Sequence, residues 1–173
     1  MKRDFKSRPL ILSRGSSFIP HRYPILYSGK TTVSWNTLRK IPYYLCKSFD
    51  NGAQFWAHDV GGYGGGTEDN ELYIRSVQLS VFSPILKFGI EKGKYYKREP
   101  FKWDIKTKTI ARDYLTLRHK LIPYIYSEAY KYHKFGSQLI TPLYYKKPEF
   151  YDDILYSIES FFLYGLYHSL CGF

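Results

Sequence analysis

The chain has 173 residues and a mass of 20.5 kDa, the size of one ordinary domain, or of most of one domain with the start of another. Hydrophobic residues make up 44% of it and charged residues 24%, which excludes a disordered chain and a fibrous repeat. Two cysteines, Cys46 and Cys171, are too few for a disulfide framework or a four-thiolate zinc site.

The chain is strongly basic, with 26 Lys and Arg against 15 Asp and Glu, a formal net charge of +11. Such an excess can attract nucleic acid or an anionic membrane. The basic residues are scattered along most of the chain rather than concentrated in one run, which is typical of an ordinary solvated surface.

No targeting segment is recognised in the sequence. The apolar stretch 9–12 that follows Lys2 and Arg3 is too short for the core of a signal peptide. The apolar stretch 158–173 contains Glu159 and falls short of the roughly 20 apolar residues that a membrane span needs. We therefore expect a cytoplasmic protein without a membrane partner.

Three short apolar runs, each closed by polar or glycine residues, predict strands that are buried on both faces. They cover residues 9–12, 54–57 and 84–88. Runs of this kind are typical of parallel sheets, because helices cover both faces or line the outside of such sheets.

A helical pattern follows each of the three runs. After the first, we expect a helix that starts behind Ser34 and ends near Pro42. After the second, Thr67 is a candidate N-cap for a helix with acidic residues in its first turn. After the third, apolar residues every four positions predict a helix over 110–135, with a kink caused by Pro123.

Repeated strand–helix order favours a parallel sheet with helices outside it. Arg14, His58 and Asp59 come just after the ends of their strands, where α/β enzymes gather their working groups. A closed (β/α)8 barrel needs eight such units and about 250 residues. We therefore predict an α/β fold with a partial barrel of about three βα units over 1–136. The truncated start of a β-rich domain is expected over 137–173.

Five segments in this order resemble the second, C-terminal half of the catalytic barrel in family 31 of the glycoside hydrolases. They are RPLILSRGSSF, HRYPILYSG with TTVSWNTL, WAHDVGGYGGG, ELYIRSVQLSVFSPIL and GKYYKREPF. The likeness runs from about residue 8 to about residue 151. It implies a (β/α)8 barrel and the retaining hydrolysis of an α-linked glucoside or xyloside, without a cofactor.

The resemblance also implies what this chain lacks. Retaining members use two aspartates, a nucleophile and a general acid/base, with carboxyl groups about 5–5.5 Å apart. The nucleophile's strand precedes the arginine motif in the family, and Met1 comes only a few residues before it here, so we expect that segment to be absent. The acid/base aspartate follows YSG in the family, where this chain has Lys30. A lysine, with an ordinary pKa of about 10.4, is a poor substitute for that carboxyl group. Gly89 stands where the family has a sugar-binding histidine.

By the same resemblance, the residues for binding the sugar are present. Arg14 resembles the family's substrate-site arginine and Asp59 its sugar-binding aspartate, with Trp56 and His58 on the same strand. Other interpretations stay open: Arg14 as a salt-bridge partner, Asp59 as a cap of the turn into the glycine-rich segment 61–66, and Trp56 as a core residue. The glycine segment lacks the Lys-Ser/Thr of a phosphate loop and is expected to form a flexible rim. No metal-ligand spacing is found, so no metal site is predicted.

Three functions remain as hypotheses. The first is a fragment of an α-glycosidase that is inactive alone, because no catalytic residue is intact. The second is a non-catalytic module that binds a sugar through Arg14 and Asp59, or a companion chain that completes the barrel, since open sheet edges and apolar helix faces favour association. The third is nucleic-acid binding by the alternating Tyr and Lys of 94–98, although these residues also match the glycosidase pattern.

Overall fold

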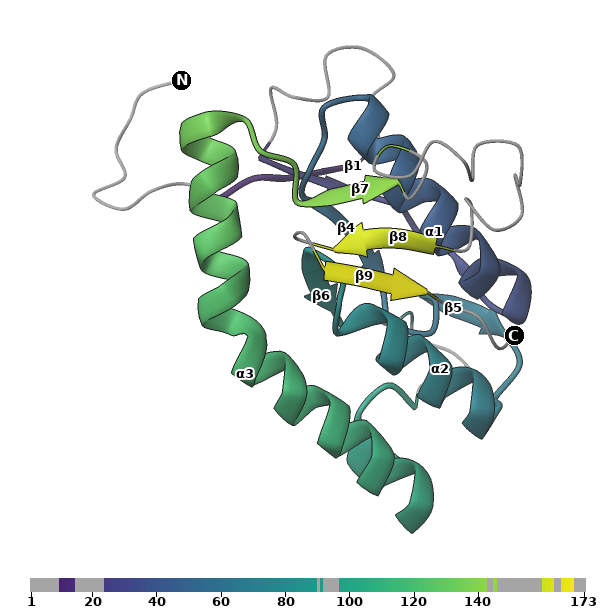
Figure 1. Ribbon diagram of the computed structural model, residues 1–173. Coiled ribbons are helices and arrows are strands. Elements are labelled where there is room, and N and C mark those ends of the chain that lie inside the picture. Colours follow the sequence, from purple (N-terminus) through teal and green to yellow (C-terminus); the bar gives the residue numbers. More distant parts are fainter. Residues whose placement is uncertain are drawn as a thin grey trace, which may run out of the picture.

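The computed structural model describes residues 10–14, 24–89, 91, 97–142, 145, 160–163 and 166–169. In chain order the elements are β1 (Leu12–Arg14), β2 (Ile25–Tyr27), β3 (Thr32–Val33), α1 (Trp35–Asp50), β4 (Trp56–Asp59), β5 (Gly64–Gly66), α2 (Asn70–Ser80), β6 (Ile85–Lys87), the 3-10 helix η2 (Pro100–Lys102), α3 (Ile105–Phe135), β7 (Ile140–Pro142), β8 (Ser160–Leu163) and β9 (Leu166–Ser169) (Figure 1).

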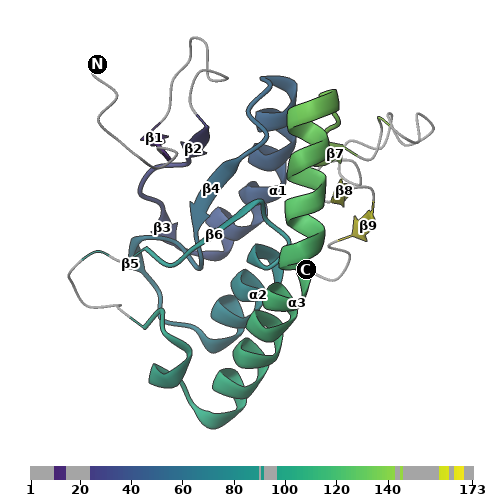
Figure 2. The same ribbon diagram turned by 90° about the vertical axis from the view of Figure 1, so that its left-hand side faces the viewer.

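The centre of the fold is a four-stranded parallel sheet with the order β1-β2-β4-β6. The helices α1, α2 and α3 follow β2, β4 and β6, so the predicted strand–helix repeat is present. Figure 2 shows the three helices on one side of this sheet, and no described helix covers the other side. The described residues therefore form an open, parallel α/β unit, and we call the sheet face that no described helix covers the bare face.

Strand β2 was not predicted, because its three residues lie between Pro24 and Ser28 and look like part of a loop. The helix α1 therefore follows β2, and not the first apolar run as predicted. The first two predicted strands also extend two residues farther at their carboxyl ends, whereas the third ends one residue earlier, at Lys87. Arg14 and Asp59 are the last residues of β1 and β4 instead of the first loop residues after them.

The starts and ends of the first two helices show which local signals prevail. Ser34 caps α1 as predicted, since its hydroxyl accepts a hydrogen bond from the N–H of Thr37 at 3.1 Å. The predicted end near Pro42 is wrong: the proline lies inside the helix, which continues because Leu45 still packs into the core. The predicted N-cap of α2 is also wrong, because Asp69, not Thr67, accepts from the first backbone N–H groups.

The long helix α3 begins earlier than the predicted residue 110. Asp104 caps it by accepting a hydrogen bond from the N–H of Thr107 at 3.0 Å. At its end Gly136 takes the left-handed conformation, with φ of 67°, that suits glycine after a helix. The helix continues through Pro123 and bends along its length (Figure 1), as expected where a proline interrupts the backbone hydrogen bonds. None of the described helices is both long and apolar enough to cross a membrane.

The main core lies between the sheet and the helices. Its fully or nearly buried side chains come from α1, α2, β3, β4 and the segment that enters β7: Val33, Leu38, Ile41, Leu45, Cys46, Trp56, Leu72, Leu79, Leu139 and Ile140. The strands β7, β8 and β9 form an antiparallel sheet, in line with the β-rich segment expected after residue 136. Because Leu139 and Ile140 pack in the same core as α1, no described linker separates this segment from the helices. A domain boundary there stays a prediction.

The glycine-rich segment 61–66 is packed against β3 and is not simply the exposed rim predicted from sequence. Its strand β5 pairs in parallel with β3. A Cβ atom on Gly66, whose φ is +80°, would lie 1.9 Å from the carbonyl oxygen of Val33, and one on Gly62 would lie 2.7 Å from that of Thr32. These glycines are therefore required because the two backbones approach more closely than any side chain allows.

The two neighbouring glycines of β5 provide a matched test of this packing. Gly65→Ala meets nothing within 4 Å and should cost about 1–2 kcal/mol of unfolding free energy from the positive φ alone. Gly66→Ala should cost at least about 3 kcal/mol, because β3 and β5 must move apart. Urea unfolding followed by circular dichroism measures both. Equal losses would contradict the close approach of the two strands.

Candidate functional site

Four polar side chains lie on one face of the parallel sheet at its carboxyl edge. In the register of the sheet Arg14 is paired with Tyr27, Tyr27 with Ala57, and Asp59 with Lys87. Paired residues of neighbouring strands share a face, and residues two apart along a strand share it too. Arg14, Tyr27, Asp59 and Lys87 therefore project from the four strands on the same side.

The other two residues predicted for sugar binding project to the opposite side. Trp56 lies in the core beside α1, where its ring stacks on that of Tyr44 with centroids 6.0 Å apart. His58 is buried, and its Nε2 lies 2.8 Å from the Oγ of Ser83. The structure thus places Arg14 and Asp59 on the bare face, and Trp56 and His58 on the helix-covered face. Sugar binding by any of the four stays a prediction.

Asp59 is held by two partners. Its buried carboxylate accepts hydrogen bonds from the hydroxyl of Tyr27 and from the ammonium group of Lys87. The same ammonium lies 4.4 Å from the centroid of the Tyr27 ring, a cation–π contact. Burial, and then the hydrogen bond to Asp59, raise the pKa of Tyr27 above its ordinary value, so its hydroxyl stays a donor.

Tyr27 and Lys87 were not predicted from the sequence as site residues. Lys87 is the last residue of the half-buried strand β6, and a charged residue at a strand end was the signal already used for Arg14. Tyr27 carried no such signal, because its strand was not predicted.

Gly89 has a direct steric explanation in this cluster. A Cβ atom there would lie 1.9 Å from the Oδ1 of Asp59 and 2.7 Å from the Nζ of Lys87. Because the ion pair fills this space, a larger residue such as the family's histidine does not fit beside it. Position 89 therefore has room only for glycine while Lys87 lies beside Asp59.

Arg14 is the exposed cation of the cluster. Its guanidinium lies along the backbone of Gly29, where a Cβ atom would be 3.2 Å from Nε and 3.4 Å from a terminal nitrogen. Within the described part of the chain, Arg14 has no hydrogen-bond or ion-pair partner. Its donor groups can therefore serve a ligand, since a guanidinium offers five N–H groups in a fixed plane.

Lys30, which the resemblance alone aligns with the family's acid/base, also has local partners. Its Nζ lies 3.6 Å from a carboxylate oxygen of Glu91 and 4.8 Å from the centroid of the Tyr63 ring. Both charged side chains are about half exposed. Among the residues that the structure describes, no group of three or more His, Cys, Asp and Glu could hold a metal ion.

The basic segment 94–98 falls partly outside the described residues, which include only Lys97 and Arg98 of it. Lys97 pairs with Glu68 at 2.6 Å. Arg98 is buried and donates to the carbonyl oxygen of Gly62 at 3.2 Å. Both cations contact other groups of this protein. Arg98, which is buried, is therefore not available to bind the phosphate backbone of a nucleic acid.

The ion pair in the cluster can be tested with two lysine variants. Lys87→Met leaves the buried carboxylate of Asp59 without its cation, which should cost about 2–3 kcal/mol of unfolding free energy. The cost is substantial because solvent screens the pair only partly: the side chain of Lys87 is 31% exposed and that of Asp59 is fully buried. Lys102→Met removes a surface pair with Glu99 and should cost at most about 1 kcal/mol. If urea unfolding gives equal losses, the pair does not stabilise this edge of the sheet.

His58 predicts a pH dependence of stability. Burial lowers its pKa from 6.5 to about 4. Between these values the unfolded chain binds a proton that the folded chain does not, so acidification from pH 6.5 to 4 should reduce the unfolding free energy by up to about 3 kcal/mol. His58→Gln should remove this component, and the exposed His119→Gln should keep it. Unfolding midpoints across that pH range measure the difference.

Proteins of similar sequence are α-glycosidases that are much longer than this chain. The α-xylosidase of Saccharolobus solfataricus is 31% identical over 173 residues, which cover 96% of this chain and 23% of that protein. The neutral α-glucosidase AB of Mus musculus is 32% identical over 161 residues, which cover 91% of this chain and 16% of the relative. The chain therefore spans less than a quarter of the length of these relatives.

The fold is also similar to solved structures. A glucosidase II α subunit, solved with Glc1Man2 bound, matches with a TM-score of 0.80 and 26% identity over 90% of this chain and 17% of its own. A xylosidase from Aspergillus niger, at 22% identity and a TM-score of 0.68 over 80% of this chain and 23% of its own, shows the fold alone. Residues 1–128 match the pattern of the glycosyl hydrolases family 31 TIM-barrel domain. With most of its length in that match, the chain belongs to family 31 of the glycosyl hydrolases.

Proposed function

We propose that this chain supplies the sugar-binding edge of an α-glycosidase barrel and does not hydrolyse glycosides with its own residues. The observation that carries the proposal is the common placement of Arg14, Tyr27, Asp59 and Lys87 at the carboxyl ends of four parallel strands. That edge is where enzymes with this architecture bind their substrates. The similar proteins are named as α-xylosidases and α-glucosidases, so the substrate class is an α-linked xyloside or glucoside.

The roles of the residues follow from their contacts. Arg14 is exposed and donates hydrogen bonds to sugar oxygens near the reacting centre. The carboxylate of Asp59 has no exposed surface, so it acts by holding the hydroxyl of Tyr27 and the ammonium group of Lys87 at the strand ends. Lys87, whose side chain is 31% exposed, can donate to a sugar hydroxyl beside Arg14. Binding by this edge positions the glycosidic bond.

Hydrolysis with retention needs more than positioning. One carboxylate must attack the anomeric carbon while a carboxyl group about 5–5.5 Å away protonates the leaving oxygen. Lys30 offers an ammonium group at the acid/base position, and the nearby Glu91 is paired with it. The carboxylate of Asp59 is buried and paired with Lys87, so it is not free to attack an anomeric carbon. We therefore assign no catalytic carboxylate to the described residues.

A specific observation also favours association with the rest of a barrel. The edges of the parallel sheet are β1 and β6, and the segment at β1 exposes Leu10, Ile11 and Leu12 by 74%, 46% and 44%. Unpaired strand edges with exposed apolar side chains are sites of strand addition. We propose that a segment with the remaining strands pairs there, whether it belongs to a longer polypeptide or to a companion chain.

The first test is enzymatic. The purified chain should release no nitrophenol from 4-nitrophenyl α-D-glucoside or α-D-xyloside above the buffer rate. Saturable hydrolysis that disappears in an Arg14→Ala variant would overturn the proposed inactivity. The same assay on a full-length relative serves as the positive control.

Complementation then tests the placement of Lys30. We would add the preceding barrel half of the S. solfataricus α-xylosidase, which by family resemblance brings the nucleophile. With the wild-type chain, only a dinitrophenyl glycoside should be cleaved, because that leaving group departs without a proton. Lys30→Asp should extend cleavage to an alkyl xyloside, whereas Lys102→Asp, with the same charge change, should not. If both variants cleave the same substrates, position 30 is not the site of proton transfer.

A further inference from the structure

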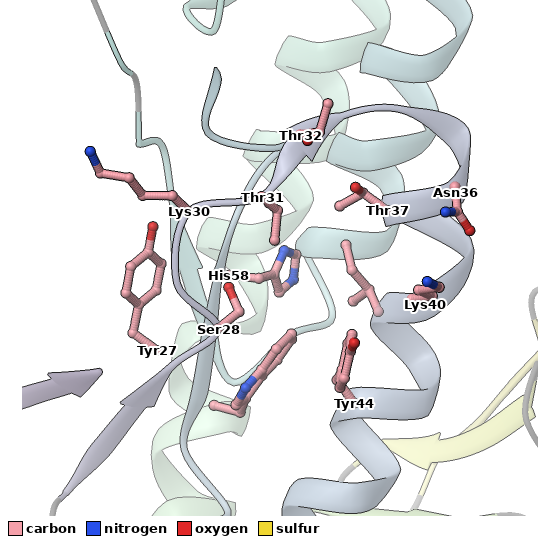
Figure 3. A pocket seen from close by; sticks show the side chains of 12 residues that line it. Tyr27, Ser28, Lys30, Thr31, Thr32, Asn36, Thr37, Lys40, Tyr44 and His58 are labelled. Atoms are coloured by element: carbon pink, nitrogen blue, oxygen red, sulfur yellow. The ribbon is translucent and has the colours of Figure 1, made fainter. Parts of the chain in front are cut away.

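A cavity of about 480 Å³ lies beside the connection from β2 to α1. Its walls come from the end of β2, from this connection, from the first turns of α1 and from β4. In Figure 3 the side chains of Ser28, Thr31, Thr37, Tyr44 and His58 surround a common space, and those of Tyr27 and Lys30 border it from the other side of the connection. Of the strand-end cluster only Tyr27 lines the cavity, and Arg14, Asp59 and Lys87 do not.

The floor of the cavity is aromatic. The rings of Tyr44 and Trp56 stack with an interplanar angle of 29°. Trp56 is almost fully buried in the core, whereas Tyr44 is 46% exposed, so part of its ring remains open to a ligand. An aromatic face of this kind packs well against the C–H groups of a ring that is polar at its edges.

Apart from two lysines, the walls of the cavity are polar and uncharged. They carry the hydroxyl groups of Ser28, Thr31 and Thr37 and the imidazole of His58, which is neutral at pH 7 because burial lowers its pKa. His58 Nδ1 is buried and has no hydrogen-bond partner among the described residues. Hydroxyl groups and a neutral imidazole both donate and accept hydrogen bonds, as the hydroxyl groups of a sugar do. Of the two lysines that line the cavity, Lys30 is paired with Glu91.

We propose that this cavity binds a hexopyranose ring of a carbohydrate, as a second site on the helix-covered side of the sheet. The volume lies within the range of roughly 300–1,000 Å³ that small-molecule sites have. The ring would lie against Tyr44, with its hydroxyl groups bonded to Thr31, Thr37 and His58. This site does not depend on the proposed role of Arg14 and Asp59, which lie on the other face of the sheet.

Two adjacent tyrosines of α1 provide the test. Tyr44 lines the cavity, and Tyr43, which is 41% exposed, does not. Methyl α-D-glucopyranoside and maltose are titrated while the indole N–H resonance of Trp56 is followed by NMR. Wild type should show a saturable shift, Tyr44→Ala should weaken the affinity at least tenfold, and Tyr43→Ala should leave it within twofold. Thr31→Val keeps the shape of the side chain and removes one hydroxyl group, so it should weaken the affinity for the sugar several-fold. This variant tests the site even if Tyr44→Ala disturbs the fold.

Two controls separate this site from its alternatives. Arg14→Ala should leave the Trp56 shift unchanged, whether or not the strand-end cluster binds sugar. A shift that disappears in Arg14→Ala would place the sugar at the cluster and overturn the proposal. Inorganic phosphate is the counter-ligand, because lysines and a helix N-terminus at the rim could bind an anion. The proposal is also overturned if phosphate shifts the Trp56 resonance and the two sugars do not, or if neither sugar gives a saturable shift.

Discussion

The buried carboxylate of Asp59 is the constraint on which this edge of the molecule depends. Burying a carboxylate completely costs free energy of folding unless hydrogen bonds and a counter-charge surround it. Tyr27 and Lys87 provide both, and they come from the strands on either side of β4. The ion pair thus ties together three strands at the end where a barrel enzyme binds its substrate. Gly89 completes the arrangement, because any Cβ atom there would enter the space of the pair.

The alternation of side chains along β4 separates two environments that are adjacent in sequence. Asp59 faces the bare side of the sheet, while Trp56 and His58 face α1. The same strand therefore contributes to a charged cluster on one side and to a neutral, aromatic cavity on the other. Burial lowers the pKa of His58 by more than the negative charge of Asp59 raises it, so His58 stays neutral beside the charged cluster.

Sequence reasoning predicted the parts of this structure that depend on local patterns. The three helices, the cap by Ser34, and the positions of Arg14 and Asp59 at strand ends all follow from periodicity and capping chemistry. Strand β2 could not be predicted in this way, because three residues carry no periodicity and its stability comes from neighbours on both sides. The partnership of Lys87 with Asp59 depends on the register of two strands that lie 28 positions apart in sequence. Which face Trp56 occupies depends on where β4 begins, and the strand lies two residues later than its predicted start.

The proposed function assigns sugar binding and acetal cleavage to different parts of a family 31 barrel. The proposed sugar-binding edge draws on four neighbouring strands of the parallel sheet. By the resemblance, the catalytic pair would come from a segment that precedes the arginine motif and from the position of Lys30. Binding contacts are many and individually weak, so an edge that retains them still orients a sugar. Acetal cleavage with retention instead depends on two carboxyl groups that act together, and it is lost when either is replaced. A lysine at position 30 is therefore compatible with the proposed sugar-binding edge, and its ammonium group pairs with Glu91 instead of standing free as a proton donor would need to.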